Sequence, residues 1–328
     1  MRIGNFVIFE NNIKRLSALI SGLGCPENPK KSNTVEGDIN IGRDLYASTR
    51  IGKKRDNQED AVVIMKYPAN PKYKMIVVAD GVGGNEKGEE ASYITVTQIK
   101  EWFNTLEVSD FSNEDTLVAK LGQKLNSISQ QICKLKCNAG TTFVCAIVAK
   151  NNTVIVNVGD SRAYVVNGNN FKQISKDDSI GEKLYEGGNI KTRDDIRFHI
   201  NGNVITEWLG QESAIKPNVK TIPNDAYDAV LLFSDGVTDC LSDNQIYAIT
   251  KKTNHKELAK VIVNNAINTD SKRAKRGDKT DMAYYEEIKG GKDNTTAAVY
   301  INKTKGKSRK NERWYIRNCK WKWRSKKI

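Results

Sequence analysis

Histidine is scarce in this chain of 328 residues, which contains only His199 and His255. Neither lies near a cysteine or a pair of acids at the spacing of a zinc ligand set, so a zinc enzyme is not expected. The six cysteines show no paired framework, and we interpret them as reduced thiols. Cys133 and Cys137 lie one helical turn apart, where packing is their expected role.

Long apolar runs are also missing. No run approaches the roughly 20 residues that cross a bilayer. The first 24 residues mix apolar side chains with Glu10, Lys14 and Arg15, which is not the order of a signal peptide. A hydrophobic content of 38% is enough for a sizeable core. We therefore expect a cytoplasmic protein with a packed interior.

The net charge of +13 belongs to one end of the chain. Residues 303–328 hold twelve lysines and arginines against Glu312, a net charge of +11, which leaves +2 for all other residues. Four aromatic side chains interrupt this basic tail: Trp314, Tyr315, Trp321 and Trp323. The tail is either a solvated, flexible segment or a contact for an anionic partner, nucleic acid or a membrane surface. The sequence does not choose between these alternatives.

Three parts are expected along the chain: an N-terminal extension and linker over 1–41, a folded domain over 42–302, and the basic tail over 303–328. Apolar spacing predicts helices within 88–103, 116–135, 243–251 and 256–267. Strands are predicted over 143–149, 154–158 and 163–166, with hairpin-type turns between them. Residues 176–228 are polar and loop-rich. The hairpins argue against a doubly wound parallel sheet and favour an antiparallel sandwich with helices on its outer faces.

Acids stand beside four short apolar runs, each with a small or turn-forming neighbour: Asp80, Asp160, Asp235 and Asp293. Short apolar runs bounded by turn residues are typical of buried strands, so these carboxylates should project from the rim of a sheet. Glu59 and Asp60 extend the set. Two like charges about 4 Å apart repel by roughly 4 kcal/mol at an effective dielectric constant of 20, and bound cations relieve that repulsion. Oxygen ligands suit Mg²⁺, Mn²⁺ or Ca²⁺. The alternative is that each Asp-Gly pair forms an ordinary hairpin turn.

Seven motifs follow one another in the order of a known family: 55–60, 79–84, 88–92, 140–142, 159–162, 234–239 and 293–295. Together they resemble the motifs of metal-dependent serine/threonine protein phosphatases of type 2C, in their bacterial form. The resemblance covers about residues 43–302. It implies an α+β fold, a central antiparallel β-sandwich flanked by helices on both outer faces in four α-β-β-α layers. A two-metal site is implied at one edge of the sandwich.

The resemblance also implies roles for individual residues. Asp80 would bridge two Mn²⁺ or Mg²⁺ ions, with the Gly81 carbonyl as a further ligand. The other implied ligands are Asp235 and Asp293 for one ion, Glu59 and Asp60 for the second, and Asp160 and Asp239 for a third, weaker ion. Arg55 would grip the substrate phosphate, and the catalytic set is Arg55, Asp80 and Asp235.

The implied reaction is hydrolysis of phosphoserine or phosphothreonine by in-line attack of a metal-bridging water. The implied partners are phosphorylated proteins and an opposing serine/threonine kinase. Many eukaryotic members carry a histidine where this chain has Val82, so leaving-group protonation would fall to a metal-bound water or matter little in a loose transition state. Two alternatives are a catalytically weak relative that binds phosphoproteins or scaffolds a complex, and a basic-tail protein associated with nucleic acid or a membrane.

Two further features are less specific. The segment 178–210 is similar to the flap that borders the site in this family, although a passive loop would have the same composition. Arg162 is expected to be a structural ion-pair partner rather than a substrate ligand.

Overall fold

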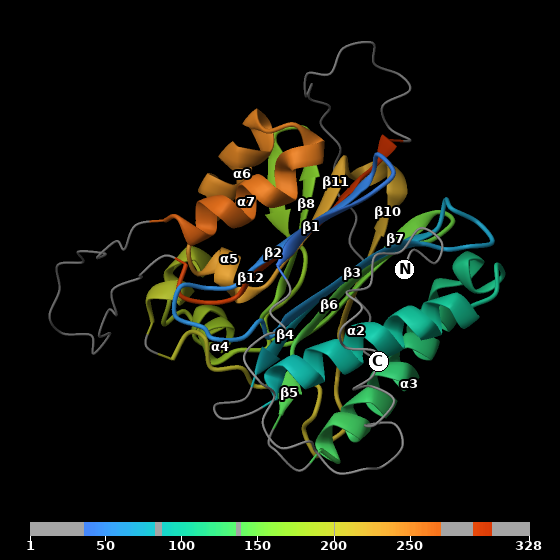
Figure 1. Ribbon diagram of the computed structural model, residues 1–328, viewed down its shortest axis with the longest axis horizontal. Coiled ribbons are helices and arrows are strands. Elements are labelled where there is room, and N and C mark those ends of the chain that lie inside the picture. The colour runs from blue at the N-terminus through green and yellow to red at the C-terminus, as the bar shows by residue number, and fades with distance from the viewer. Residues whose placement is uncertain (1–35, 83–86, 136–138, 200, 270–290, 304–328) are drawn as a thin grey trace, which may run out of the picture.

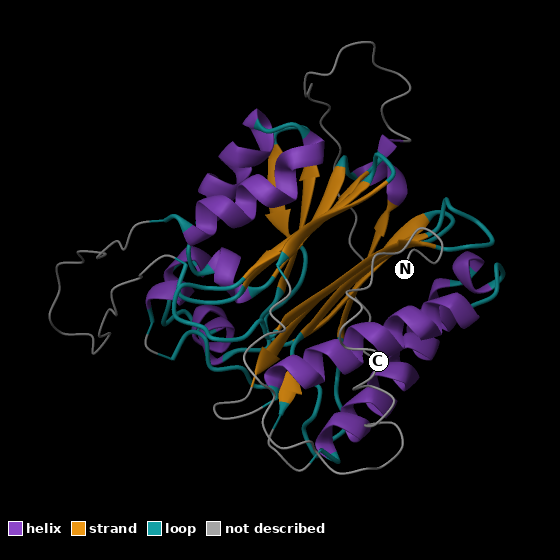
Figure 2. Ribbon diagram, in the orientation of Figure 1, coloured by secondary structure: helices purple, strands orange, loops and turns teal. Residues whose placement is uncertain are grey.

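Two antiparallel sheets stacked face to face form the centre of the fold (Figures 1 and 2). The computed structural model describes residues 36–82, 87–135, 139–199, 201–269 and 291–303. The first sheet has the strand order β1 (Gly37–Ile41), β2 (Leu45–Arg50), β12 (Thr295–Ile301), β11 (Ala229–Phe233), β8 (Arg162–Asn167) and β9 (Asn170–Gln173). The second has the order β10 (Asn218–Pro223), β7 (Asn152–Val158), β6 (Phe143–Val148), β4 (Lys74–Val82) and β3 (Asp60–Lys66), with β5 (Gly140–Thr141) paired to β4.

Helices cover the outer face of each sheet (Figure 1). The second sheet is covered by α2 (Gly88–Thr105) and α3 (Glu114–Cys133). The first is covered by α6 (Asp243–Lys252) and α7 (Leu258–Ile267), with the short α5 (Asp235–Thr238) at its edge. The remaining helical pieces are α4 (Ile180–Glu186), η2 (Asp110–Ser112), η3 (Arg193–Phe198), η4 (Asn224–Ala226) and η5 (His255–Glu257). The predicted α-β-β-α sandwich is therefore confirmed.

Three clusters of buried apolar side chains lie between the four layers of helices and sheets. Strand β4 contributes side chains to two of these clusters. Successive side chains of a strand point to opposite faces of its sheet. Val77 therefore packs against α2 and α3, whereas Ile76 and Val78 pack against the other sheet. Both faces are buried, which explains why the sequence shows a continuous apolar run here rather than an alternating one.

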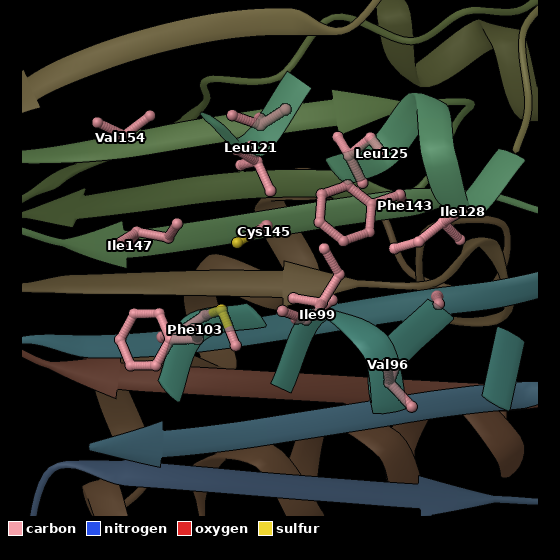
Figure 3. Packing of buried hydrophobic residues seen from close by; sticks show 14 of the residues in the cluster. Val96, Ile99, Phe103, Leu121, Leu125, Ile128, Phe143, Cys145, Ile147 and Val154 are labelled. Carbon is pink, nitrogen blue, oxygen red and sulfur yellow. The ribbon is translucent and has the colours of Figure 1, made fainter. Parts of the chain in front are cut away.

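The layer between the helices and the second sheet is shown in Figure 3. Leu121, Leu125 and Ile128 of α3 are fully buried there and point toward Phe143 and Cys145 of β6. Their spacing of three and four residues is the helical pattern that the sequence displayed. The helix begins two residues before the predicted start, because the Asn113 side chain accepts the backbone N–H of Thr116 at 3.1 Å.

The polar stretch 176–228 contains more structure than its composition indicated. It includes α4, η3 and the edge strand β10, which pairs with β7. Most of β10 is only half-buried, so its side chains give no clear apolar signal. In the same way, β1 lies at a sheet edge inside the stretch expected to be a linker, with only Ile39 buried.

Several expectations fall on residues outside the described ranges, namely the first 35 residues and nearly all of the basic tail. Within the described residues, no helix combines the length and apolar character needed to cross a membrane.

Leu121→Ala tests the layer between α3 and the second sheet. Its side chain is fully buried, so the substitution should lower the free energy of unfolding by about 2 to 5 kcal/mol through lost burial and a residual cavity. Val108→Ala is the matched control, because Val108 is 48% exposed and should change that energy by less than about 0.5 kcal/mol. Denaturant unfolding of both variants gives the two values. Equal losses would contradict the assigned packing.

Candidate metal centre

The acids singled out in the sequence lie at one end of the sandwich, although they come from distant segments. Asp60 begins β3 and lies directly opposite Asp80 of β4 in the antiparallel register. Asp235 follows β11 and Asp293 precedes β12, and these two strands pair antiparallel, so their adjoining ends share one edge of the first sheet. Each sheet thus contributes carboxylates to this carboxylate edge, which we define as Glu59, Asp60, Asp80, Asp235 and Asp293.

Ser234 joins the two sheets at the carboxylate edge. Its hydroxyl donates to Asp60 Oδ2 at 2.8 Å and accepts the backbone N–H of Thr296 at 3.0 Å. Ser234 itself is fully buried. Ser234 opens the motif 234–239, but nothing in the sequence marks its hydroxyl as the group that links the two sheets.

Asn294 fixes the loop that carries Glu59. Its side-chain oxygen accepts the Glu59 N–H at 3.0 Å, and its amide donates to the Asn57 carbonyl at 3.0 Å. The Glu59 carbonyl in turn accepts the N–H of Gly81 at 3.1 Å and the hydroxyl of Ser92 at 2.5 Å. Segments from both sheets and from α2 therefore hold Glu59 in place.

Two glycines allow backbone segments to touch at this edge. A Cβ on Gly81 would overlap the carbonyl of Gly88, and a Cβ on Gly236 would overlap the carbonyl oxygen of Asn294. Close approach of backbone is a recognised reason for glycine. The Asp-Gly pairs at 80–81 and 235–236 thus reflect packing at the edge rather than hairpin turns, since Asp80 lies within β4 and Asp235 begins α5.

Burial raises the pKa of every aspartate and glutamate at the edge for which a shift is resolved. For Asp80 and Asp235 the pKa lies well above the ordinary value, first because of burial and then because neighbouring carboxylates repel the charged form. Burial, opposed by hydrogen bonds from Thr296 and Ser234, raises the pKa of Asp60 to about 6. Burial likewise raises the pKa of Glu59 to about 7. The charged form of these acids is therefore disfavoured at the edge unless a counter-charge is bound there.

Arg55 lies on the exposed side of this edge. Its Nε and Nη2 donate to the two carboxylate oxygens of Asp293 at 2.7 and 2.8 Å, and Nη1 lies 3.3 Å from Glu59 Oε2. The bonds to Asp293 raise the pKa of the Arg55 guanidinium. The side chain remains 46% exposed, so the guanidinium faces solvent and the carboxylates at once.

The edge fits a bound cation by its donor chemistry. Asp60 Oδ1 and Asp235 Oδ1 are buried without a hydrogen-bond partner, which is costly unless a cation compensates. The side-chain atoms of the carboxylate edge that can bind a metal ion are all carboxylate oxygens. Oxygen ligands are the ones that Mg²⁺ and Mn²⁺ prefer. As the side chains stand, however, no three acidic, histidine or cysteine groups in the described ranges form a ready ligand set, and Arg55 occupies both oxygens of Asp293. Ion binding therefore requires side-chain rearrangement here.

Asp160 and Asp239 form a second, neighbouring pair of acids. Burial, followed by the charges of Asp177 and Asp239, raises the pKa of Asp160 to about 7. The amide of Asn203 donates to Asp239 Oδ2 at 2.6 Å. Asn203 belongs to the segment 178–210, so this segment reaches the site through that bond. No motif or spacing in the sequence marks Asn203 as a site residue.

The segment 178–210 is anchored at several points. The Ile180 N–H donates to the Val204 carbonyl at 2.8 Å, and buried Glu182 pairs with Arg193. The segment therefore contains ordered structure, which is compatible both with a flap beside the site and with a passive loop. Just before it, Arg162 is buried and bonds Asp177 at 2.7 and 2.8 Å, which confirms the expected structural ion pair.

Both histidines lie outside the carboxylate edge. His199 follows η3, where its Nδ1 accepts the N–H of Asn201 at 3.2 Å. His255 begins η5 in the connection between α6 and α7.

Comparison with known proteins decides the family. A profile of the family described as protein phosphatase 2C matches residues 51–270 of this chain. The chain belongs to the protein phosphatase 2C family. The serine/threonine phosphatase Stp of Listeria welshimeri is 30% identical over 220 residues, a match that covers 66% of this chain and 86% of that protein.

Solved structures of phosphatases share the fold. Serine/threonine phosphatase Stp1 from Staphylococcus aureus superposes with a TM-score of 0.65 at 27% identity, covering 82% of this chain and 98% of the other. The catalytic domain of the protein phosphatase PstP, solved in complex with two manganese ions, has a TM-score of 0.60 at 24% identity and covers 78% of this chain and 96% of its own. At that identity, the second likeness supports the fold only.

Gly236→Ala tests the close approach at the carboxylate edge. The new Cβ would overlap the Asn294 carbonyl oxygen, so the free energy of unfolding should fall by about 1 to 3 kcal/mol. Gly122→Ala is the matched control: Gly122 lies within α3, and a Cβ there meets nothing within 4 Å. Relief of the helical glycine penalty should raise the stability of this control by roughly 0.5 to 1 kcal/mol. Stabilisation of both variants in denaturant unfolding would overturn the packing assigned to Gly236.

Proposed function

We propose that this chain hydrolyses phosphoserine and phosphothreonine in proteins, with its reaction centre at the carboxylate edge. The observation that supports this most strongly is the convergence of buried acids from both sheets beside a half-exposed arginine, in a member of the protein phosphatase 2C family. Phosphatase chemistry needs a cluster that holds cations and a cationic group that holds the phosphate. Buried acids and a guanidinium, the chemical groups suited to these two roles, lie together at one end of the sandwich.

Within this proposal the ligands are those that the sequence suggested. Asp80 would bridge two Mn²⁺ or Mg²⁺ ions, with the Gly81 carbonyl as a further ligand. Asp235 and Asp293 would complete the shell of one ion, and Glu59 and Asp60 would serve the other directly or through water. Asp160 and Asp239 would hold a third, weaker ion. When bound, two such ions supply a water nucleophile of lowered pKa and offset the charge of the phosphate. The two unpaired aspartate oxygens support this assignment.

Arg55 would bind the phosphate through its planar guanidinium, which can hold two phosphate oxygens at once. Its bonds to Asp293 already orient the guanidinium on the solvent-exposed side of the carboxylate edge. Because Asp293 is also a proposed ion ligand, release of Asp293 to an ion would free the Arg55 donors for the substrate. Electrostatics thus couples the two binding events.

No histidine takes part in this proposal. Val82 stands where many eukaryotic relatives have one, and His199 and His255 lie elsewhere. A loose transition state for phosphoryl transfer places little demand on a general acid. In this proposal the reaction therefore depends on offsetting the negative charge of the phosphate and on orienting the phosphate for attack.

We also propose the broader organisation that the sequence suggested. Residues 42–302 would form the phosphatase domain together with β1 (Gly37–Ile41), because this strand pairs with β2 and so belongs to the first sheet rather than to the N-terminal extension expected over 1–41. The proteins acted on would be products of an opposing serine/threonine kinase. The basic tail over 303–328 would contact an anionic partner through its charge and its aromatic side chains.

Asp235→Asn tests the ion site through binding and stability as well as turnover. Removing one carboxylate charge should weaken Mn²⁺ binding by at least about tenfold to a hundredfold, a loss seen even when a group behind a ligand is removed. Turnover on a phosphothreonine peptide should fall by orders of magnitude. Calorimetric titration with Mn²⁺ and peptide kinetics measure the two effects.

Thermal unfolding with and without Mn²⁺ controls for a damaged fold. Without the ion, the Asp235→Asn variant should be at least as stable as the parent, because it no longer buries an uncompensated carboxylate. Mn²⁺ at about 100 times its dissociation constant should stabilise the parent by about 2.7 kcal/mol, and the variant much less at the same concentration. Equal Mn²⁺ affinity and near-parental turnover in the variant would refute the assignment of Asp235.

Arg55→Ala tests the phosphate contact. Loss of charge-assisted bonds should raise KM for a phosphopeptide by roughly tenfold to a hundredfold. Arg55→Lys should fall between the parent and the alanine variant, because an ammonium keeps the charge but not the fork. Stability should change little, since the side chain is half exposed. Steady-state kinetics that showed an unchanged KM for both variants would remove Arg55 from the site.

A further inference from the structure

Three lysines border Arg55 in the structure, and none of them is needed for the chemistry described above. Lys53 and Lys54 precede Arg55 and are exposed, and Lys292 precedes Asp293. We call these three residues the basic rim. The sequence motif that includes Arg55 begins after the first two, so the family resemblance assigned the rim no role.

Backbone bonds place the rim beside the proposed phosphate site. The Lys53 N–H donates to the Gly291 carbonyl at 2.6 Å, and the Lys54 N–H donates to the Lys292 carbonyl at 3.2 Å. A turn closed by the Arg55 N–H and the Gly52 carbonyl at 3.1 Å carries the chain onward to Arg55. Segments bonded in this way lie about 5 Å apart, which is within the roughly 8 Å screening length at physiological ionic strength.

Buried contact fixes this loop as well. A Cβ on Gly52 would overlap the backbone of Lys292 and Asp293, so the two segments are in direct contact. The segment with Lys53 and Lys54 therefore cannot move away without disturbing the Arg55–Asp293 pair. The lysine backbones are fixed, while their side chains keep access to solvent.

In the part of the chain that the structure describes, little negative charge near the rim offsets these lysines. Within the described residues, no ion pair involves any of the three, whereas Arg55 is paired with both Asp293 and Glu59. Asp56 is the one acid in the exposed part of the same loop. Glu36 lies close by, with Oε1 accepting the Ile51 N–H at 2.6 Å. The buried carboxylates would be largely offset by their own ions, which leaves the rim as surplus positive charge.

We infer that the basic rim selects phosphorylated segments with acidic side chains next to the phosphoserine or phosphothreonine. This inference rests on the proposed function and names its substrate class. A peptide whose phosphate bonds Arg55 must pass over the rim, because Lys54 adjoins Arg55 in the chain and Lys292 adjoins its partner Asp293. Flanking glutamates or aspartates gain attraction there, and flanking lysines meet repulsion.

Three phosphothreonine peptides of equal length test the inference, with glutamate, alanine or lysine on both sides of the phosphothreonine. The full chain with Mn²⁺ should show the highest kcat/KM for the glutamate peptide and the lowest for the lysine peptide. The difference should lie mainly in KM and shrink as salt rises from about 0.05 to 0.5 M, because screening weakens exposed charges. Hydrolysis of p-nitrophenyl phosphate by the same chain reports the phosphatase activity without flanking residues.

A double substitution, Lys53→Ala with Lys54→Ala, removes most of the rim and keeps both backbone donors. It should lower the ratio of kcat/KM between the glutamate and alanine peptides by roughly threefold to tenfold, the effect expected from two exposed charges. The matched control is Lys150→Ala with Lys256→Ala. Both control lysines are exposed, at the β6–β7 turn and in η5, away from the carboxylate edge, so the ratio should stay at the parental value.

The outcomes separate the two proposals. If the chain hydrolyses p-nitrophenyl phosphate and also hydrolyses the three peptides with the same kcat/KM for each peptide, the role of the rim is overturned. The proposed function then stands. A parental ratio in the rim variant would do the same. Failure to hydrolyse any of the four substrates would overturn both. The predicted ratio in the parent, lost in the rim variant and kept in the control, supports the inference.

Discussion

Buried carboxylates at the junction of two sheets are the constraint on which this structure depends. A carboxylate that leaves water must find hydrogen bonds, a counter-charge or a proton. Ser234 donates a hydrogen bond to one oxygen of Asp60, and Arg55 supplies the hydrogen bonds and counter-charge for Asp293. One oxygen of Asp60 and one of Asp235 have no hydrogen-bond partner. The protein therefore folds with an electrostatic cost at this edge. Bound ions are the simplest way to recover that cost.

The rest of the fold supplies the stability that makes such an edge possible. Three apolar layers bury both faces of the central strands, and α2 and α7 brace the two sheets from outside. Because β3 and β4 pair from Asp60–Asp80 through to Lys66–Lys74, the acids at their end inherit the rigidity of the whole ladder. A shift of one residue would turn either aspartate to the opposite face. Strand register therefore determines which side chains meet.

Local pattern was sufficient to predict the layers and the acids, but not the contacts that connect them. Apolar spacing located α2, α3 and the strands β6 to β8, and the strand-end position of Asp80, Asp235 and Asp293 indicated the edge. Ser234 and Asn294 lie within recognised motifs and Asn203 does not, but the contacts of all three were not predicted. Their partners lie more than 30 residues away, and no periodicity marks a single hydrogen bond. Edge strands β1 and β10 were missed because a half-buried strand has the composition of a loop.

The same two segments that shape the ion site also shape its approach. Residues 52–55 and 291–293 are bonded backbone to backbone, so one contact fixes Asp293, Arg55 and the lysines of the basic rim together. If the groups that react with the phosphate and the lysines that recognise its flanking residues were independent, they would lie on two loops with separate backbone contacts. Here a change in either segment that moved Arg55 would also move the rim. The positions of the catalytic charges and of the lysines that set substrate preference are consequently linked through these two short backbone segments. The lysines can still be substituted without disturbing the backbone bonds between the segments, because their side chains take no part in those bonds.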